Sequence, residues 1–184
     1  KKLRASMLRH EEDLYGALKK DLGKSRMESY MCEIGLTLSE LTWMEKHIRR
    51  LTREKRVPTP LAQFAARSFQ SPTPYGTVLI MSPWNYPVLL TLEPLIDALA
   101  AGNTVIVKPS AYAPATSAVM EMIIKETYPP EYVRMITGGR QENQALLTQR
   151  FDKIFFTGGK TVGREVLRHA AEYLTPVTLE LGGK

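Results

Sequence analysis

The chain has 184 residues, of which 43% are hydrophobic and 24% are charged, and its formal net charge is +6. This composition is that of an ordinary globular protein that can bury one good core. No apolar run reaches the roughly 18 residues that a transmembrane helix needs, and no signal-peptide pattern opens the sequence, so we expect no membrane span. The single cysteine, Cys32, excludes an internal disulfide and favours a reducing, cytoplasmic location.

The positive charge is concentrated near the N-terminus. Residues 1–60 hold 14 Lys and Arg against 9 Asp and Glu, a balance of +5, whereas residues 61–184 hold 11 against 10, a balance of +1. The two signs are interleaved at helical spacing, and no aromatic stacking platform lies among them. This pattern is typical of solvated amphipathic helices, so we expect no nucleic-acid partner.

Apolar residues recur at every third or fourth position between about Leu3 and Leu51. This spacing predicts two or three amphipathic helices with a break near residues 23–25. Prolines then end the helical part, which we place at residues 1–60. Residues 61–74 are expected to be extended, with an edge segment from Ser68 to Pro74, because Pro72 and Pro74 cannot donate to a strand ladder.

From Tyr75 onward, short apolar runs alternate with helical stretches. The predicted strands are 77–81, 104–108, 133–136, 153–157 and 176–180. The predicted helices are 88–101, 114–127, 142–149 and 161–173. Nearly all-apolar strands separated by helices predict a doubly wound, mostly parallel sheet, so we expect an α/β fold with a Rossmann-like domain at residues 75–184.

The segment Pro83-Trp84-Asn85-Tyr86-Pro87 follows the first of these strands. Ligands of open α/β sheets bind outside the carboxyl ends of the strands, so an amide and an indole at this tip are candidates for a site. A rigid turn is the alternative for the whole segment, and a core tryptophan is the alternative for Trp84.

Glycines follow the strand at 153–157, but no G-x-G-x-x-G motif occurs. A Walker A site is excluded because its first glycine would fall on Ile154. Gly158 and Gly159 at a strand-to-helix turn could let a pyrophosphate approach backbone N–H groups, and a plain tight turn is the alternative. Lys108, at the end of the second strand, is a second candidate, with a simple surface charge as the alternative.

Three motifs together resemble the aldehyde dehydrogenase superfamily: Pro-Trp-Asn-Tyr-Pro at 83–87, Lys-Pro-Ser at 108–110, and Leu-Thr-Pro-Val-Thr-Leu-Glu-Leu-Gly-Gly-Lys at 174–184. The resemblance covers about residues 3–184. It is greatest to the class 3 branch, whose members oxidise medium-chain, fatty or aromatic aldehydes.

This resemblance implies roles for individual residues. Asn85 corresponds to the donor that stabilises the oxyanion, and Glu180 to the general base that directs water onto a cysteine thioester. Two glycines, at 182 and 183, would let the Glu180 carboxylate swing. The implied cofactor is NAD or NADP, held by Ser82, Pro83, Trp84, Lys108, Ser110, Gly138, Thr157, Gly158, Gly159, Gly163 and Leu181.

Two positions depart from the family pattern. Gly159 stands where a serine is usual, so a hydroxyl contact to the cofactor is missing there. Ala111 stands where many members carry a glutamate that accepts from the ribose 2′-OH. Without that carboxylate, a 2′-phosphate meets less repulsion, so we expect NADP to be accepted at least as well as NAD.

The family's nucleophilic cysteine lies some tens of residues after the Glu-Leu-Gly-Gly-Lys motif. Cys32 is expected to be a buried structural residue, and the three histidines lack metal-ligand spacing. We therefore expect the N-terminal part of an enzyme, with the catalytic domain absent. We expect it to be inactive alone and to expose apolar surface. The resemblance also implies that residues 61–74 belong to an oligomerisation hairpin and that the complete protein forms a homodimer.

Other functions remain open. The chain could be a stand-alone nucleotide-binding module without catalysis. It could also belong to a reductase of acyl thioesters or acyl phosphates, although Glu180 argues against an enzyme that lacks a deacylating base. A basic, helix-rich interaction protein would leave the strand-tip motifs unexplained.

Overall fold

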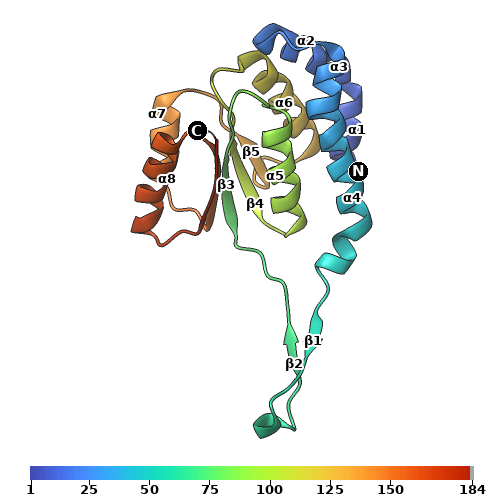
Figure 1. Cartoon of the computed structure of the whole chain (residues 1–184), viewed down its shortest axis with the longest axis vertical. Coiled ribbons are helices and arrows are strands. Elements are labelled where there is room, and N and C mark those ends of the chain that lie inside the picture. Colours follow the sequence, from blue (N-terminus) through green and yellow to red (C-terminus); the bar gives the residue numbers. More distant parts are fainter. Residues whose placement is uncertain (183–184) are drawn as a thin grey trace.

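The computed structural model describes residues 1–182, and nearly all of the first 51 are helical (Figure 1). The segments are α1 (Lys2–Arg9), α2 (Glu11–Leu22), α3 (Arg26–Ser29), the π-helical turn η1 (Tyr30–Ile34) and α4 (Gly35–Leu51). The predicted break is confirmed, because Gly23 ends α2 with a φ of 70° and Ser25 caps α3. Within residues 1–182, no helix is both long and apolar enough to span a bilayer.

An arm extends from the body between α4 and the main sheet (Figure 1). It consists of β1 (Lys55–Val57), the 3-10 turn η2 (Leu61–Gln63) and β2 (Ser68–Gln70), with β1 and β2 antiparallel. Helix α4 ends at Leu51, where the apolar periodicity of the sequence also ends. The prolines at 58 and 60 favour extended backbone for the residues that precede them, which continues the strand conformation away from the helix.

The main sheet has five parallel strands in the order β5-β4-β3-β6-β7. The strands are β3 (Thr77–Met81), β4 (Thr104–Lys108), β5 (Val133–Met135), β6 (Lys153–Gly158) and β7 (Val177–Leu181). The helices between them are α5 (Leu89–Ala100), α6 (Pro114–Thr127), α7 (Arg140–Leu147) and α8 (Lys160–Glu172). The predicted α/β alternation is therefore confirmed.

Helices cover both faces of this sheet, as expected for a doubly wound fold. On one face, Val78 and Val107 pack with Leu92 of α5 and with residues of the N-terminal helices and α6 in one core. On the other face, Leu79 and Phe156 belong to a second core that includes residues of α7 and α8. Successive side chains along each strand point to opposite faces of the sheet, so each strand contributes residues to both cores.

The N-terminal helices also supply hydrogen-bond acceptors to the starts of α5 and α6. The Asp21 carboxylate accepts from the Thr116 N–H at 2.7 Å, and Glu33 Oε2 accepts from the Val88 N–H at 2.7 Å. A carboxylate at these positions satisfies otherwise unpaired amides and faces the positive end of the helix dipole. The N-terminal region thereby fixes where α5 and α6 begin, next to the strand tips.

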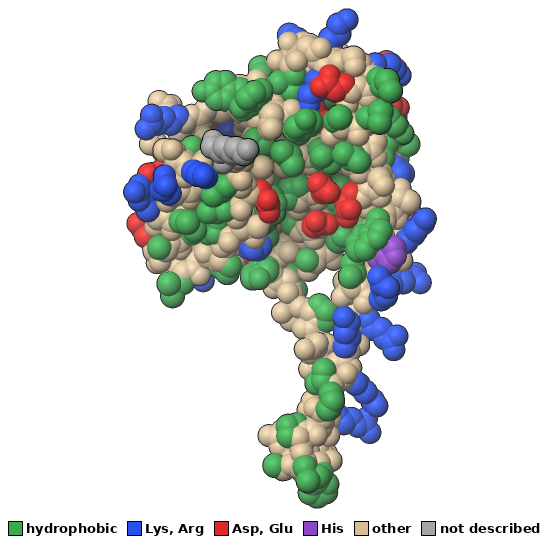
Figure 2. All heavy atoms as spheres, viewed as in Figure 1, with side chains coloured by type: hydrophobic (Ala, Val, Ile, Leu, Met, Phe, Trp, Pro, Cys, Tyr) green, Lys and Arg blue, Asp and Glu red, His purple; other side chains and the backbone are tan. Residues whose placement is uncertain are grey.

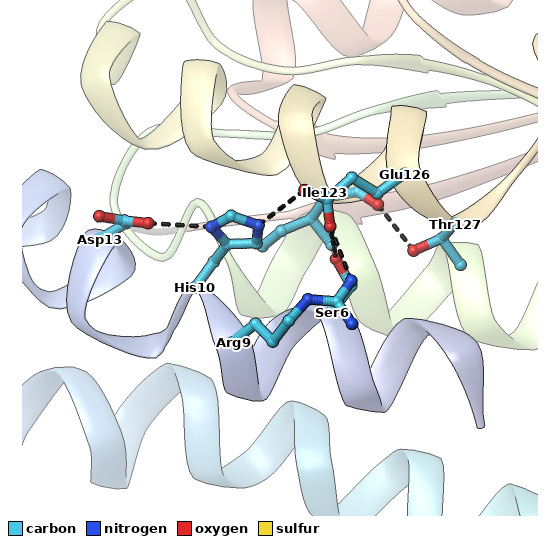
Figure 3. A network of polar contacts seen from close by, with 7 residues as sticks. All are labelled: Ser6, Arg9, His10, Asp13, Ile123, Glu126 and Thr127. Carbon is cyan, nitrogen blue, oxygen red and sulfur yellow. Dashed lines mark hydrogen bonds and ion pairs between the residues drawn. The ribbon is translucent and has the colours of Figure 1, made fainter.

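A polar network joins α6 to the first two helices (Figure 3). Glu126 accepts from Ser6 Oγ and Arg9 Nη2 at 2.9 Å, and its other oxygen lies 2.9 Å from His10 Nε2. His10 Nδ1 lies 2.9 Å from Asp13 Oδ2. Hydrogen bonds with Asp13 and Glu126 raise the pKa of His10, and those from Arg9, His10 and Ser6 lower the pKa of Glu126 to about 2.

These pKa shifts predict a pH-dependent effect of His10→Gln. Because folding raises the pKa of His10, its stabilising effect is present below its ordinary value of 6.5 and is lost as pH rises through the folded value. Glu126 contributes above 4.5 and loses its contribution as pH falls toward about 2. We expect thermal denaturation of His10→Gln to show a larger loss of Tm at about pH 5.5 than at about pH 8.5.

His169→Gln is the matched control, because this histidine of α8 has no carboxylate partner within residues 1–182. Its effect on Tm should not follow the pH difference seen for His10. Equal losses at both pH values for His10→Gln would contradict the role assigned to the network.

Candidate cofactor and active site

A groove of about 490 Å³ lies at the carboxyl ends of β3, β4 and β6, beside the starts of α7 and α8. It brings together residues from four separate segments of the chain, as the strand order predicts. Nine of the eleven residues predicted to bind a cofactor line it: Ser82, Pro83, Trp84, Lys108, Ser110, Gly138, Thr157, Gly158 and Gly159.

Residues at the tip of β3 form one wall of the groove. Trp84 is 52% exposed there, so its interpretation as a core tryptophan is wrong. Ser82 is fixed by two contacts: its N–H donates to the Lys108 carbonyl at 3.1 Å, and its hydroxyl lies 2.6 Å from that of Thr91. The indole is thus presented on a strand end that is itself held in place.

Lys108 is a buried cation, which excludes its interpretation as a surface charge. Its side chain is 2% exposed, and Nζ donates to the carbonyls of Pro109 at 2.8 Å and Gly138 at 2.7 Å. Burial lowers its pKa, and the negative charge of Glu142 opposes that effect. An ammonium has three donors, so one remains for a ligand in the groove.

The groove is positive in character. Lys108 and Arg140 line it, and no Asp or Glu lines it within the described part of the chain. The nearby Glu142 carboxylate is engaged by the Gly139 N–H at 2.6 Å. Two basic side chains beside helix starts suit a ligand that carries phosphates.

Two buried polar atoms in the groove lining have no hydrogen-bond partner within residues 1–182. They are Asn143 Oδ1 and Thr157 Oγ1. Buried polar groups in folded proteins are normally paired, so both fit a ligand that carries hydroxyl or amide groups. Arg140 and Asn143 were missed by the sequence analysis, although they lie in the first turn of α7, just after Gly138 and Gly139, where a groove residue is expected.

The glycines of the turn after β6 serve different purposes. A Cβ on Gly158 would lie 2.6 Å from Phe156 Cζ, so the turn needs glycine there, whereas a Cβ on Gly159 would meet nothing within 4 Å. Gly163 is buried, and its Cβ would approach Leu181 Cδ2 at 3.0 Å. Gly163 and Leu181 therefore pack α8 against β7 and do not line the groove.

A second hollow, of about 650 Å³, lies between α5 and the ends of β6 and β7 on the opposite face. Thr157 lines both hollows, and its register partner on β7 is Glu180, which lines the second. Figure 2 shows acidic side chains among hydrophobic ones on this face. Burial raises the pKa of Asp97 to about 6, and the charges of Glu40 and Glu93 add to this effect. An anionic ligand therefore fits the first hollow better than this one.

Asn85 is exposed in the turn between β3 and α5, and Glu180 is exposed near the end of β7, where it borders the hollow beside α5. Asn85 belongs to the turn into α5, and Glu180 shares the second hollow with residues of α5. Neither carboxamide nor carboxylate has a hydrogen-bond partner within residues 1–182, and neither hollow is lined by Asn85. Gly182 is open at its Cβ position, whereas Gly183 and Lys184 lie outside the described residues.

The turn that carries Asn85 rests on a buried ion pair that the sequence analysis did not identify. Lys24 Nζ lies 2.6 Å from Glu33 Oε1 and donates to the Asn85 carbonyl at 2.7 Å. Burial raises the pKa of Glu33, while Lys24 and the Val88 amide oppose that shift. The neighbouring Cys32 is only partly buried, contrary to the expectation of a buried cysteine, and lines neither hollow.

The family model that matches the chain is that of the aldehyde dehydrogenase family, and it covers residues 1–184. The chain belongs to the aldehyde dehydrogenase family. It is 46% identical over 184 residues to a 4,4'-diaponeurosporen-aldehyde dehydrogenase of Staphylococcus aureus, covering 100% of this chain and 40% of that protein. It is 41% identical over 184 residues to aldehyde dehydrogenase family 3 member H1 of Arabidopsis thaliana, covering 100% of this chain and 38% of that protein.

Solved structures agree with this assignment. A Mycobacterium tuberculosis aldehyde dehydrogenase complexed with NAD+ matches with a TM-score of 0.87 at 28% identity, covering 99% of this chain and 37% of that one. The resemblance to class 3 enzymes is confirmed by the family 3 relative. The chain spans about 40% of the length of the relatives it matches.

The backbone conformation at Gly138 predicts the effect of an added methyl group at that position. Gly138 has a φ of 126°, and a Cβ there would lie 2.4 Å from the Glu142 carboxyl carbon. We expect Gly138→Ala to destabilise the chain by about 1–3 kcal/mol in urea unfolding and to weaken binding in the groove. The matched control is Gly16→Ala within α2, where nothing lies within 4 Å. That change should stabilise by about 0.5–1 kcal/mol, and losses of equal size at both sites would contradict the prediction.

Proposed function

We propose that the complete protein oxidises an aldehyde to a carboxylic acid with NAD or NADP. In this proposal the chain supplies the cofactor site, the oxyanion donor and the general base. One observation carries it: this chain, which belongs to the family, forms a groove at the carboxyl ends of its parallel strands. The described residues that line this groove include the cations Lys108 and Arg140 and no Asp or Glu. That is where and how a dinucleotide phosphate would be held.

The groove residues suit a nicotinamide dinucleotide. Lys108 and Ser110 would hold the adenosine ribose, and the turn at Gly158 and Gly159 would bring backbone N–H groups close to the pyrophosphate. Trp84 would lie beside the cofactor. Once bound, the cofactor supplies a hydride acceptor. An aldehyde dehydrogenase matched here is itself a complex with NAD+, which supports this assignment.

Two residues would act on the substrate. The Asn85 carboxamide is neutral, and the prolines on either side of its turn restrict the backbone, so it could stabilise a developing oxyanion with little reorganisation. The Glu180 carboxylate at the end of β7 would take a proton from the water that releases the acid. The family resemblance implies that the nucleophile is a cysteine outside these 184 residues.

The substrate class and assembly follow from relatives and surface. Similarity to class 3 enzymes, and to an enzyme named for a diaponeurosporen-aldehyde, supports an apolar substrate such as a medium-chain, fatty or aromatic aldehyde. Leu61 and Phe64 on the arm are 88% and 84% exposed, which suits a homodimer contact. A single cysteine suits a cytoplasmic enzyme.

A stand-alone nucleotide-binding module is the second candidate. It is favoured by the groove, which this chain forms by itself, while its one cysteine lines neither hollow. Under both candidates we expect the 184-residue chain to bind NADP in a Trp84 fluorescence titration and to show no turnover of hexanal or benzaldehyde. Turnover by this chain above background would contradict the assignment of the nucleophile to another segment.

The complete protein distinguishes the two candidates. Asn85→Ala should lower kcat about 100- to 1000-fold, because it removes one donor to the oxyanion, and should leave NADP affinity within twofold. Thr52→Ala, at the end of α4 and away from both hollows, is the control. A complete protein that oxidises no aldehyde would favour the binding module.

The absence of a carboxylate at position 111 predicts cofactor choice. We expect NADP to bind at least as tightly as NAD. We expect Ala111→Glu to weaken NADP binding about tenfold or more, because the new carboxylate would repel the 2′-phosphate of NADP. Isothermal titration of the chain with each cofactor measures both. Tyr112→Glu, at the exposed neighbouring residue, is the control that tests whether a negative charge at a nearby position weakens NADP binding as well. A tenfold preference of the unmodified chain for NAD would refute this prediction.

A further inference from the structure

Lys24 and Glu33 are sealed beneath the turn that carries Asn85. Their exposed fractions are 7% and 0%, and Nζ lies 2.6 Å from Oε1. Removing two opposite charges from water is costly, and well-packed apolar residues often stabilise a fold as well or better. A role in fixing geometry would explain why charges occupy this position.

The pair holds the turn at two points of its backbone. Lys24 Nζ donates to the Asn85 carbonyl at 2.7 Å, and Glu33 Oε2 accepts from the Val88 N–H at 2.7 Å. The carboxylate also faces the positive end of α5. Because one ion pair makes both contacts, the backbone before and after Pro87 is tied to the same anchor.

Asn85 depends on this anchor because its side chain has no support of its own. The carboxamide is exposed and makes no hydrogen bond within the part of the chain that the structure describes. Lys24 Nζ lies 4.0 Å from the centroid of the Tyr86 ring, which fixes the following residue as well. Displacement of a catalytic group by about 1 Å can cost 100-fold in rate, so the position of this backbone matters.

A local irregularity aims Glu33 inward. It lies in η1, a π-helical turn of the kind often found near functional sites. A Cβ on Gly35 would lie 2.8 Å from the Tyr30 carbonyl oxygen, so the turn closes only with glycine at that position. The hydroxyl of Thr37, in the first turn of α4, donates to the Glu33 carbonyl at 3.0 Å and stabilises the π-helical turn.

We infer that Lys24 and Glu33 are positioning residues that hold the Asn85 carboxamide where it can stabilise the oxyanion. The inference rests on the proposed function. The pair acts through the Asn85 carbonyl and the start of α5 and does not touch the substrate or the cofactor groove.

A double-mutant cycle in the complete protein tests this role. Lys24→Met should lower kcat for hexanal about 10- to 100-fold while the NADP dissociation constant stays within twofold. In an Asn85→Ala background, the same change should alter kcat less than threefold, because the group it positions is already gone. A full further loss in that background, or unchanged kcat in Lys24→Met alone, would overturn the inference.

Two further variants complete the design. Arg26→Met is the matched control: Arg26 forms an exposed pair with Glu12 and lies 4.2 Å from the Tyr15 ring centroid, and its loss should leave kcat within twofold. Glu33→Gln keeps the shape and a hydrogen-bond acceptor but removes the charge. It replaces Lys24→Met in the cycle, with the same expected pattern, if Lys24→Met does not fold.

Amide exchange on the 184-residue chain separates this inference from the proposed function. Lys24→Met should speed exchange of the Val88 and Leu89 amides, which donate to Glu33, at least tenfold, and Arg26→Met should not. Unchanged exchange at these amides would overturn the inference. Faster exchange together with a complete protein that oxidises no aldehyde would refute the proposed function and the catalytic purpose of the turn, but would leave the anchoring of the turn intact.

Discussion

The buried Lys24–Glu33 ion pair is the contact on which the arrangement of the strand tips depends. A carboxylate that is buried away from water is stable only if a cation and hydrogen-bond donors surround it. Lys24 supplies the cation to Glu33, and the amides of Val88 and Leu89 at the start of α5 supply the donors. Asp21 makes a similar contact with the start of α6. Elements that lie far from the sheet in sequence therefore determine the geometry of its carboxyl edge.

Charge separates the two hollows on either side of that edge. Lys108 and Arg140 line the groove beside α7 and α8, while Asp97 and Glu180 line the hollow beside α5. Thr157 borders both. In the proposed function, a dinucleotide would place its phosphates in the positive groove and its oxidised nicotinamide ring, which carries a positive charge, toward Glu180, with the end of β6 between them.

The sequence predicted what depends on local pattern. Five apolar strands and the helices between them were recognised because nearly all-apolar runs alternate with helical spacing, and the strand tips then indicated Trp84 and Lys108. Lys24 could not be identified this way. A lysine in a helix break and a glutamate in a helix look like solvent-facing charges, and their partners lie 61 and 55 positions away. The family resemblance implied that Gly163 helps to hold the cofactor, but its contact with β7 depends on how closely the helix approaches the sheet.

The order of synthesis gives the Glu33 contact a further consequence. A ribosome releases the N-terminal helices first, yet the amide that Glu33 needs follows 55 residues later. Until Val88 has been synthesised, the Glu33 carboxylate lacks this donor and must stay hydrated. The helical segment around Glu33 is thus kept from its final packing until β3 and the start of α5 have emerged, which favours joint folding of the two regions.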